Sequence, residues 1–379
     1  MNEFLLPIDP SELHAFAQSA RKFSAPRALL SDPAALAYDR AHFQAMATLG
    51  LCGLGLEEHY GGIDVGALGT AAIIFELARA DLGPAIYLSV HLMVAKLLSR
   101  ADSDGRAAEL IASLARGEKL AAFALTEPEA GSDAAALRTK ATSKDGEYYL
   151  SGEKCYITSG GVADLYLVFA RSGGNEKADI SAFLVPSDTE GLSFGPAEKK
   201  MGCIGAPICS LSFDHCRVPQ SARLGAEGAG YSLALSGLNG GRINIGAAAC
   251  GIAARAIEIA ASHLKQRTQF GRPLAEFQGL QFMLADMAIL LRTAVLAVRD
   301  AALAEDRGEH ARVAASIAKC VATDAAMKIT TDAVQLLGGA GYLQEYIAER
   351  LMRDAKMLQI VEGTNQIQRV LIARSLLQE

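Results

Sequence analysis

The pattern of apolar and polar positions divides the chain into three stretches. Up to about residue 120, apolar residues recur at the spacing of one buried helix face, as in residues 72–78 and 90–98. From about 121 to 230, short apolar runs alternate with turn residues such as Asp145-Gly146, which predicts strands. From about 231 onwards the helical spacing returns, for example between Leu284 and Val298. The order is therefore helices, strands, helices.

These stretches predict an α+β fold that is mainly α. Closely spaced strands with no helical segment between them favour an antiparallel sheet or small barrel over a parallel, doubly wound sheet. Long helices joined by short connections normally form a bundle. We expect an N-terminal α-helical domain at residues 1–120, a middle antiparallel β domain at 121–230 and a C-terminal helical bundle domain at 231–379.

Composition and charge argue against several classes of protein. A length of 379 residues exceeds what one hydrophobic core usually serves. No uninterrupted apolar run reaches about eighteen residues, so we expect no membrane insertion, and residues 1–5 lack the start of a signal peptide. The net charge of −6 gives no basic face for nucleic acid. Seven scattered cysteines without C-x-x-C and seven unpaired histidines predict a cytoplasmic protein with reduced thiols and no metal site.

Two segments of the strand region could line a flat cofactor. Residues 125–133 leave a strand through a Pro and Gly turn and end in a Ser-Asp pair, which could cap the Ala-rich turn that follows. Exposed backbone donors there suit a phosphate or a ring edge. In residues 152–161, Tyr156 and Thr158 are two apart and would share one face of a strand. An ordinary strand-to-helix connection and an ordinary strand end are the structural alternatives.

Two further segments connect helices. Residues 267–273 follow one helix and precede Phe277 and Gln278, which open the next; an arginine in such a turn could hold a pyrophosphate. The alternative is a solvated loop. Residues 335–342 close another helix with glycines. They are not a dinucleotide-binding fingerprint, because no strand precedes them and the spacing differs, so we expect no NAD domain.

Glu362 is the candidate for acid–base chemistry. It stands between Val361 and Gly363 in an apolar loop before a helix, where Asn365 and Gln368 could form a capping box. Burial in such a loop would raise the pKa of the carboxyl towards that of a general base, while the helix N-terminus would lower it. A solvated carboxylate at a helix start is the structural alternative.

Taken together and in order, these segments resemble the acyl-CoA dehydrogenase family. The resemblance rests on the motifs LTEPEAGSD, RTQFGRP, QLLGGAGY and VEGTNQIQ and runs over about residues 16–377. It implies a C-terminal domain that is a four-helix bundle, and FAD held between the middle and C-terminal domains of a homotetramer. It further implies an acyl-CoA substrate and an electron-transfer flavoprotein as acceptor.

The resemblance also implies roles for individual residues. Glu362 would be the catalytic base. The flavin would be lined by Phe123, Leu125, Thr126, Gly131, Ser132, Tyr156, Ile157, Thr158, Thr364 and Gln366. The FAD of a neighbouring subunit would be reached by Arg267, Phe270, Phe277, Gln278, Gln335, Leu336, Gly338 and Gly339. The substrate would be touched by Ser132, Asn239, Arg242 and Gly363.

The implied reaction is α,β-dehydrogenation to a trans-2-enoyl-CoA. Glu362 would remove the α-proton, its backbone N–H would help to stabilise the thioester oxygen, and the flavin would accept hydride from the β-carbon. One branch of the family carries its base immediately before the arginine that corresponds to Arg242; here that position is Gly241. Residues 240–245 and 280–282 look most like the isobutyryl-CoA type, so we expect a short or short-branched acyl group.

Alternatives remain on the same fold and outside it. An acyl-CoA oxidase or an acyl-carrier-protein-linked dehydrogenase would share these motifs. A nitroalkane-oxidising relative would be expected to carry aspartate as base, and a flavin-dependent hydroxylase would normally lose the carboxylate. A non-catalytic acyl-CoA-binding protein could have retained the fold; a protein without flavin colour would favour it.

Overall fold

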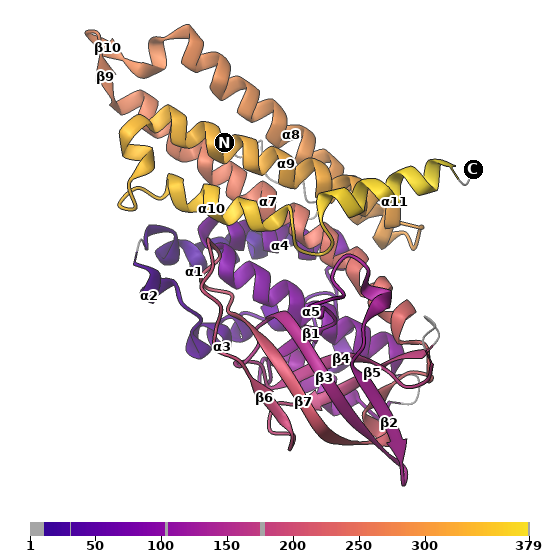
Figure 1. Cartoon of the computed structure of the whole chain (residues 1–379). Coiled ribbons are helices and arrows are strands. Elements are labelled where there is room, and N and C mark those ends of the chain that lie inside the picture. The colour runs from indigo at the N-terminus through magenta and orange to yellow at the C-terminus, as the bar shows by residue number, and fades with distance from the viewer. Residues whose placement is uncertain (1–10, 31, 103–104, 175–178, 378–379) are drawn as a thin grey trace.

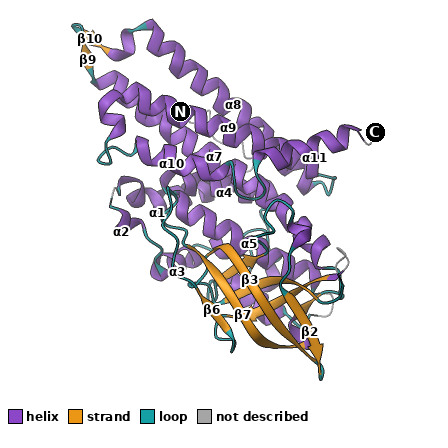
Figure 2. Cartoon of the chain, viewed as in Figure 1, coloured by secondary structure: helices purple, strands orange, loops and turns teal. Residues whose placement is uncertain are grey.

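The computed structural model describes residues 11–30, 32–102, 105–174 and 179–377, so the expected lack of a signal peptide at residues 1–5 lies outside it. The strands gather at one end of the molecule and the long C-terminal helices at the other, with the N-terminal helices between them and beside the sheet (Figures 1 and 2). The expected order of helical, β and helical domains is confirmed. The boundaries at 120 and 230 stay a prediction; the first strand begins at Ala121 and the first long C-terminal helix at Gly230.

Two N-terminal helices form the centre of the molecule. Asp81 ends α4 and begins α5, where its carboxylate accepts a hydrogen bond from the Gly83 N–H. Both helices are buried over most of their length, because α4 packs on α7 and α5 packs on both α7 and β1. The helices before the sheet are α1 (Ser11–Ser24), α2 (Pro33–Leu36), α3 (Arg40–Thr48), α4 (Gly66–Ala80), α5 (Leu82–Ala101) and α6 (Ala108–Ala115).

The middle region is a mixed sheet, so the expected antiparallel sheet was wrong in part. The order β6-β7-β3-β2-β4-β5-β8 is largely antiparallel, but β1 pairs in parallel with β4, with Phe123 opposite Leu167. β2 also pairs in parallel with β4, with Lys140 opposite Arg171, whereas β3 runs antiparallel to β2. Strand spacing along the sequence does not reveal these parallel pairings. The strands are β1 (Ala121–Ala124), β2 (Lys140–Lys144), β3 (Glu147–Thr158), β4 (Leu165–Arg171), β5 (Ile180–Pro186), β6 (Leu192–Phe194), β7 (Ile208–Pro219) and β8 (Arg223–Leu224).

The C-terminal region is built on three long helices. Small residues let α7 approach α4 closely: a Cβ at Gly251 would overlap the carbonyl oxygen of Phe75. A short hairpin of β9 (Thr268–Gln269) and β10 (Arg272–Pro273) joins α7 to α8. The helices are α7 (Gly230–Gln266), α8 (Gln278–Asp306), α9 (Arg312–Leu337), α10 (Ala348–Leu358) and α11 (Asn365–Leu377), the last two packing on α9.

Among the described residues, three helices, α5, α7 and α8, are long and apolar enough to cross a membrane by length and composition. The lack of an uninterrupted apolar run therefore does not exclude such a helix, because a few polar residues are tolerated within the span. In α5 and α7, 83% of the apolar window is buried inside the protein, which accounts for its composition. In α8 only 28% is buried, so this helix presents apolar side chains on its surface.

Candidate active site

Glu362 lies in the turn between α10 and α11. Its φ of 55° is in the left-handed region, which residues with side chains rarely adopt, and Gly363 follows with a φ of 83°. One carboxylate oxygen, Oε2, is buried and has no hydrogen-bond partner among the described residues. A Cβ added at Gly241 of α7 would lie 2.7 Å from this oxygen. The glycine therefore provides the space that the carboxylate occupies.

The surroundings of Glu362 suit a general base. Burial raises the pKa of Glu362 to about 7, against the opposing effects of Arg242 and Lys319. A pKa near neutrality combines a populated ionised form with enough basicity for proton transfer. A buried polar atom without a partner costs stability and needs an explanation, which a role as a general base would provide.

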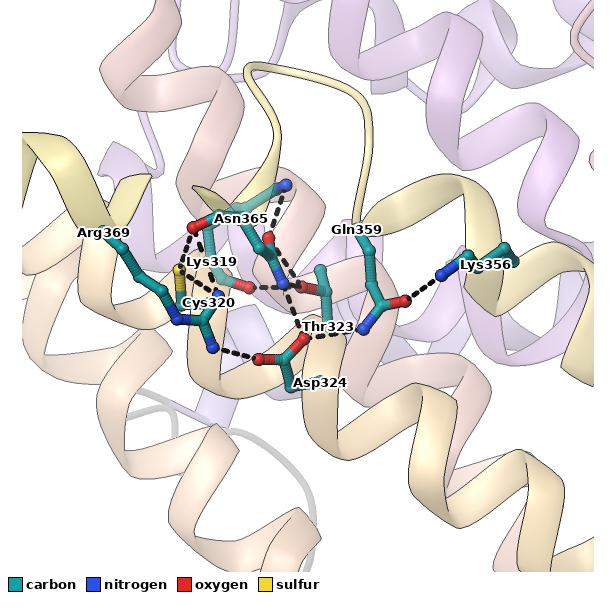
Figure 3. Close-up of polar contacts among 8 residues, drawn as sticks. All are labelled: Lys319, Cys320, Thr323, Asp324, Lys356, Gln359, Asn365 and Arg369. Atoms are coloured by element: carbon teal, nitrogen blue, oxygen red, sulfur yellow. Dashed lines mark hydrogen bonds and ion pairs between the residues drawn. The ribbon is translucent and has the colours of Figure 1, made fainter. Parts of the chain in front are cut away.

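A network of buried polar groups holds the Glu362 loop against α9 (Figure 3). The Lys319 Nζ donates to the Gly363 carbonyl at 3.0 Å and to Asn365 Oδ1 at 2.7 Å. The Asn365 Nδ2 donates in turn to Thr323 Oγ1 at 2.9 Å and to Asp324 Oδ1 at 2.7 Å. Burial lowers the pKa of Lys319 to about 8. The loop backbone is thus tied to α9 by a cation that sequence reasoning missed, because one lysine in a helical stripe carries no motif.

The expected capping box at the start of α11 is not formed. Asn365 already belongs to the helix and its side chain is directed at α9, so Thr364 takes the capping role: its Oγ1 accepts from the Ile367 N–H at 3.3 Å. Gln368 instead donates from Nε2 to the carbonyl oxygens of Glu362 and Gly363, each at 3.0 Å. Both carbonyls of the turn therefore accept from a buried side chain of α11.

Two of the predicted substrate residues, Arg242 and Gly363, lie beside Glu362, and a third, Asn239, contacts Arg242. Arg242 donates from Nη1 to Asn239 Oδ1 at 3.1 Å and makes a long contact of 3.5 Å from Nε to the Glu362 carbonyl. Gly363 is the next residue of the same turn. The fourth, Ser132, is exposed on the loop after β1, and among the described residues no hydrogen bond joins it to the other three.

A buried ion pair positions the loop that was expected to line a flavin. The Lys154 Nζ donates to Glu127 Oε1 at 2.7 Å and to the Leu125 carbonyl at 3.1 Å. The Glu127 carboxylate also accepts from the backbone N–H groups of Arg138, at 2.5 Å, and Thr139, at 3.0 Å. In this described loop Asp133 makes no side-chain cap. The Glu127 carboxylate instead accepts from the backbone N–H groups that follow the turn.

Tyr156 lies on a β-bulge. The pairing of β3 with β7 shifts register between Lys154 and Ile157, and Tyr156 has a φ of 57°. The bulge interrupts the alternation of side chains, so the expected common face with Thr158 does not follow from spacing. Tyr156 is 67% exposed. The N–H of its neighbour Cys155 donates to the Thr126 carbonyl at 2.9 Å, so Tyr156 lies beside the loop that follows β1.

This edge of the sheet fits a flavin. An exposed aromatic ring, hydroxyl groups and an open backbone turn can pack against a planar heterocycle and hydrogen-bond to its rim. Added side-chain volume at Gly131 would meet nothing within 4 Å. Leu125 and Ile157 are buried and could contribute backbone groups. The predicted residues with exposed surface here are Phe123, Thr126, Gly131, Ser132, Tyr156 and Thr158.

Thr364 and Gln366 lie at the start of α11, next to Glu362. The residues predicted to reach the FAD of a neighbouring subunit lie elsewhere. The β9–β10 hairpin lies at the end of the molecule opposite the sheet (Figure 1). Its surroundings are aromatic and cationic, with the Arg272 guanidinium 4.2 Å from the Phe277 ring centre. One protomer therefore does not bring this group to the sheet edge. Leu336 is buried and faces the core; the exposed or half-exposed members are Arg267, Phe270, Phe277, Gln278, Gln335, Gly338 and Gly339.

Comparisons with known proteins agree with this architecture. The chain matches sequence models of the acyl-CoA dehydrogenase N-terminal domain over residues 10–118, the middle domain over 122–216 and the C-terminal domain over 228–377. It is 43% identical to an acyl-CoA dehydrogenase of Bacillus subtilis, covering 94% of this chain and 95% of the relative. It is 42% identical to the mitochondrial isobutyryl-CoA dehydrogenase of Bos taurus, covering 88% and 80%.

A solved structure gives the same result in three dimensions. Butyryl-CoA dehydrogenase from Megasphaera elsdenii superposes with a TM-score of 0.94 at 38% identity, covering 98% of this chain and all of the other. The chain belongs to the acyl-CoA dehydrogenase family. It is a flavin-dependent oxidoreductase, and its cofactor is FAD.

Proposed function

We propose that this protein dehydrogenates a short or short-branched acyl-CoA to the trans-2-enoyl-CoA, with Glu362 as the catalytic base. The observation that carries the proposal is the buried, unpartnered Oε2 of Glu362 together with a pKa raised to about 7. The short or short-branched acyl group is supported by the similarity to isobutyryl- and butyryl-CoA dehydrogenases.

The residues around Glu362 support this chemistry. Glu362 Oε2 would accept the α-proton of the thioester, whose conjugate base carries charge on the carbonyl oxygen. The Glu362 backbone N–H is used by no hydrogen bond among the described residues and would donate to that oxygen. Gln368 and Lys319 hold the carbonyls on the same turn and so fix the direction of this N–H. FAD, when bound, supplies the acceptor for the hydride that leaves the β-carbon.

The FAD site would draw on two subunits of a homotetramer. The sheet edge at Tyr156 would hold the flavin, together with Thr364 and Gln366, and the hairpin that begins at Arg267 would reach the FAD of a neighbour. Their separation within one protomer supports this arrangement. Three exposed side chains on α8, each seven residues apart, offer an apolar face for another copy: Phe282, Ile289 and Leu296.

The enzyme would act in the cytoplasm, without inserting into a membrane, and pass its electrons to an electron-transfer flavoprotein. Apolar burial inside the fold accounts for two of its three long apolar helices, and subunit contacts would cover the third.

Anaerobic bleaching of the flavin absorbance by a panel of acyl-CoAs tests the proposed function. Butyryl-CoA or isobutyryl-CoA should bleach the flavin rapidly, and longer straight chains more slowly. A yellow protein that no acyl-CoA bleaches would overturn the proposed reaction while leaving the family intact.

A further inference from the structure

A cavity of about 290 Å³ lies next to the proposed base. It is lined mainly by α5 and α7, with residues 55–57 and 64 of the loop before α4, the start of α4 and the end of α8. Gly241 forms part of its wall and is the residue whose missing side chain makes room for the Glu362 carboxylate. Leu92, Met93 and Leu97 give it an apolar side. If Glu362 acts on the α-carbon, this cavity is where the rest of the acyl group extends.

Lys96 is an unexpected residue in the wall of such a cavity. Its Nζ makes one hydrogen bond among the described residues, a long one of 3.5 Å to Thr70 Oγ1. An ammonium has three N–H donors, so most of its capacity is unused. A Cβ at Gly55 would overlap the Lys96 ammonium, so this position, too, leaves space for the charge. Burial lowers the pKa of Lys96 to about 8, which still leaves most of it cationic at neutral pH.

Glu305 and Asp306, two of the acidic residues that act electrostatically on Lys96, also have partners of their own. Glu305 pairs with Arg100 at 3.3 Å, and the Asp306 carboxylate accepts from the N–H groups of Ala67 and Leu68 at the start of α4. Among the described residues no ion pair includes Lys96.

These carboxylates nevertheless determine the charge of the ligand group that Lys96 can bind. Glu57, Asp64, Glu305 and Asp306 line the cavity with Lys96 and Arg100, so the negative charges already outnumber the positive ones. An added carboxylate would be repelled. A neutral oxygen would accept the free N–H groups without that cost.

We propose that Lys96 selects an acyl group with a neutral oxygen, a hydroxyl or carbonyl, on a carbon remote from the thioester. This inference rests on the proposed function, since it needs the acyl group in this cavity. Lys96 sets specificity and is not catalytic: the charges that act on Glu362 are those of Arg242 and Lys319. Donors placed to bind an oxygen discriminate against an analogue that lacks it, because they would then be left unpaired. An unsubstituted short acyl-CoA would still react, with a lower kcat/KM.

Five-carbon substrates of the holoenzyme test the inference. Valeryl-CoA, 4- and 5-hydroxyvaleryl-CoA and glutaryl-CoA differ only in the oxygen and charge that they carry. The wild type should use one of the hydroxyvaleryl-CoAs at least about tenfold better, in kcat/KM, than valeryl-CoA, and glutaryl-CoA least well. In Lys96→Met the ratio of kcat/KM for the hydroxyvaleryl-CoA to kcat/KM for valeryl-CoA should fall towards one. Lys144→Met, at an exposed position on β2, should leave the ratios unchanged.

The outcomes separate the inference from the proposed function. Flavin content and circular dichroism show whether Lys96→Met folds; if it does not, Lys96→Gln, which retains an N–H donor without the charge, should show an intermediate ratio. A wild type that prefers valeryl-CoA, with a ratio that Lys96→Met or Lys96→Gln leaves unchanged, overturns the role of Lys96 and leaves the dehydrogenase standing. A preference for glutaryl-CoA would show that Lys96 selects a carboxylate and would overturn the proposal that it selects a neutral oxygen. Failure of every acyl-CoA to bleach the flavin overturns both.

Discussion

Glu362 and Gly241 act as a pair at the scale of single residues. The carboxylate is buried in space that exists only because α7 has no side chain at position 241. The same burial leaves Oε2 without a partner and raises the pKa of Glu362. One glycine therefore permits the base to be placed where its pKa becomes useful.

Replacing Glu362 by glutamine should remove the base and little else. Glu362→Gln is close to isosteric, so FAD and ligand binding should persist, whereas turnover should fall by roughly 10²–10⁴-fold. Steady-state turnover with an artificial acceptor measures the loss, and flavin absorbance measures cofactor content. Glu309→Gln, at an exposed position after α8, is the control. Near-normal turnover of Glu362→Gln would exclude Glu362 as the base.

A methyl group at position 241 should move the Glu362 carboxylate without changing its chemical identity. In Gly241→Ala the new Cβ would lie 2.7 Å from Glu362 Oε2, so the carboxylate must move and kcat should fall by at least about tenfold. Gly279→Ala in α8 is the control, because a Cβ there meets nothing within 4 Å and Gly279 does not line the cavity beside Gly241. The two variants should differ clearly in kcat under saturating substrate. Equal effects would mean that the space at Gly241 is not specific to Glu362.

The raised pKa of Glu362 predicts opposite trends in activity and stability. Free-enzyme kcat/KM should rise with pH through about 7, as the base ionises. Since the folded pKa lies above the ordinary value of 4.5, the stability that this group contributes is present below pH 4.5 and is lost as pH rises through about 7. Melting temperatures should therefore show Glu362→Gln gaining on the wild type between pH 5 and 8. A constant difference would contradict the shift.

At the scale of elements, the α10–α11 turn depends on α9. The Asn365 side chain links Lys319 to Asp324, and Asp324 also accepts from Arg369 of α11 at 2.7 Å. The turn that carries the base is therefore positioned by buried polar contacts between helices and not by its own sequence. Such a network is stable only if each member is satisfied.

Removing the amide at position 365 should loosen this turn. Asn365→Ala leaves Lys319 and Asp324 with unused capacity, which should cost about 1–3 kcal/mol of unfolding free energy and lower kcat while substrate binding changes less. Denaturant unfolding and steady-state kinetics measure the two effects. Arg374→Ala, at an exposed position of the same helix, should change neither by much. Unchanged stability of Asn365→Ala would show that the network is dispensable.

At the scale of the whole molecule, the exposed apolar face of α8 indicates an interface with another chain. Ile289 is 63% exposed and Phe282 is 60% exposed on a helix whose apolar window is largely uncovered. Exposed apolar area of this kind on a globular protein marks an interaction site. A second copy would cover it.

Light scattering in solution should give a mass four times the 39.8 kDa of the chain. Ile289→Lys places a charge in the proposed interface and should shift the protein to smaller species, with loss of FAD if a neighbour completes the site. Leu29→Lys, at a position that is 73% exposed outside α8, should leave the mass unchanged. A wild type with the mass of one chain would contradict the tetramer.

Much of the fold follows from local patterns, which is why it could be predicted. Helical and strand periodicity are written in neighbouring residues, and the order of helices, strands and helices was confirmed, as were the family and FAD. The position of Glu362 in an apolar loop before a helix also singled out that residue, although its role stays a prediction. The predictions that failed include details that two distant segments decide together, such as the parallel pairing of β1 with β4 and the capping role assigned to Asn365.

The sequence by itself determined the periodicity, the turns and the residue types that could do chemistry, because each depends on a few adjacent positions. Only the tertiary structure decided the surroundings of those residues. Lys319 lies 44 positions from the Gly363 carbonyl that it binds, and Arg242 lies 120 from the Glu362 carbonyl. Lys96 became informative only when folding placed it in a cavity beside Gly241. Burial and pKa arise from such distant contacts, and no local pattern encodes them.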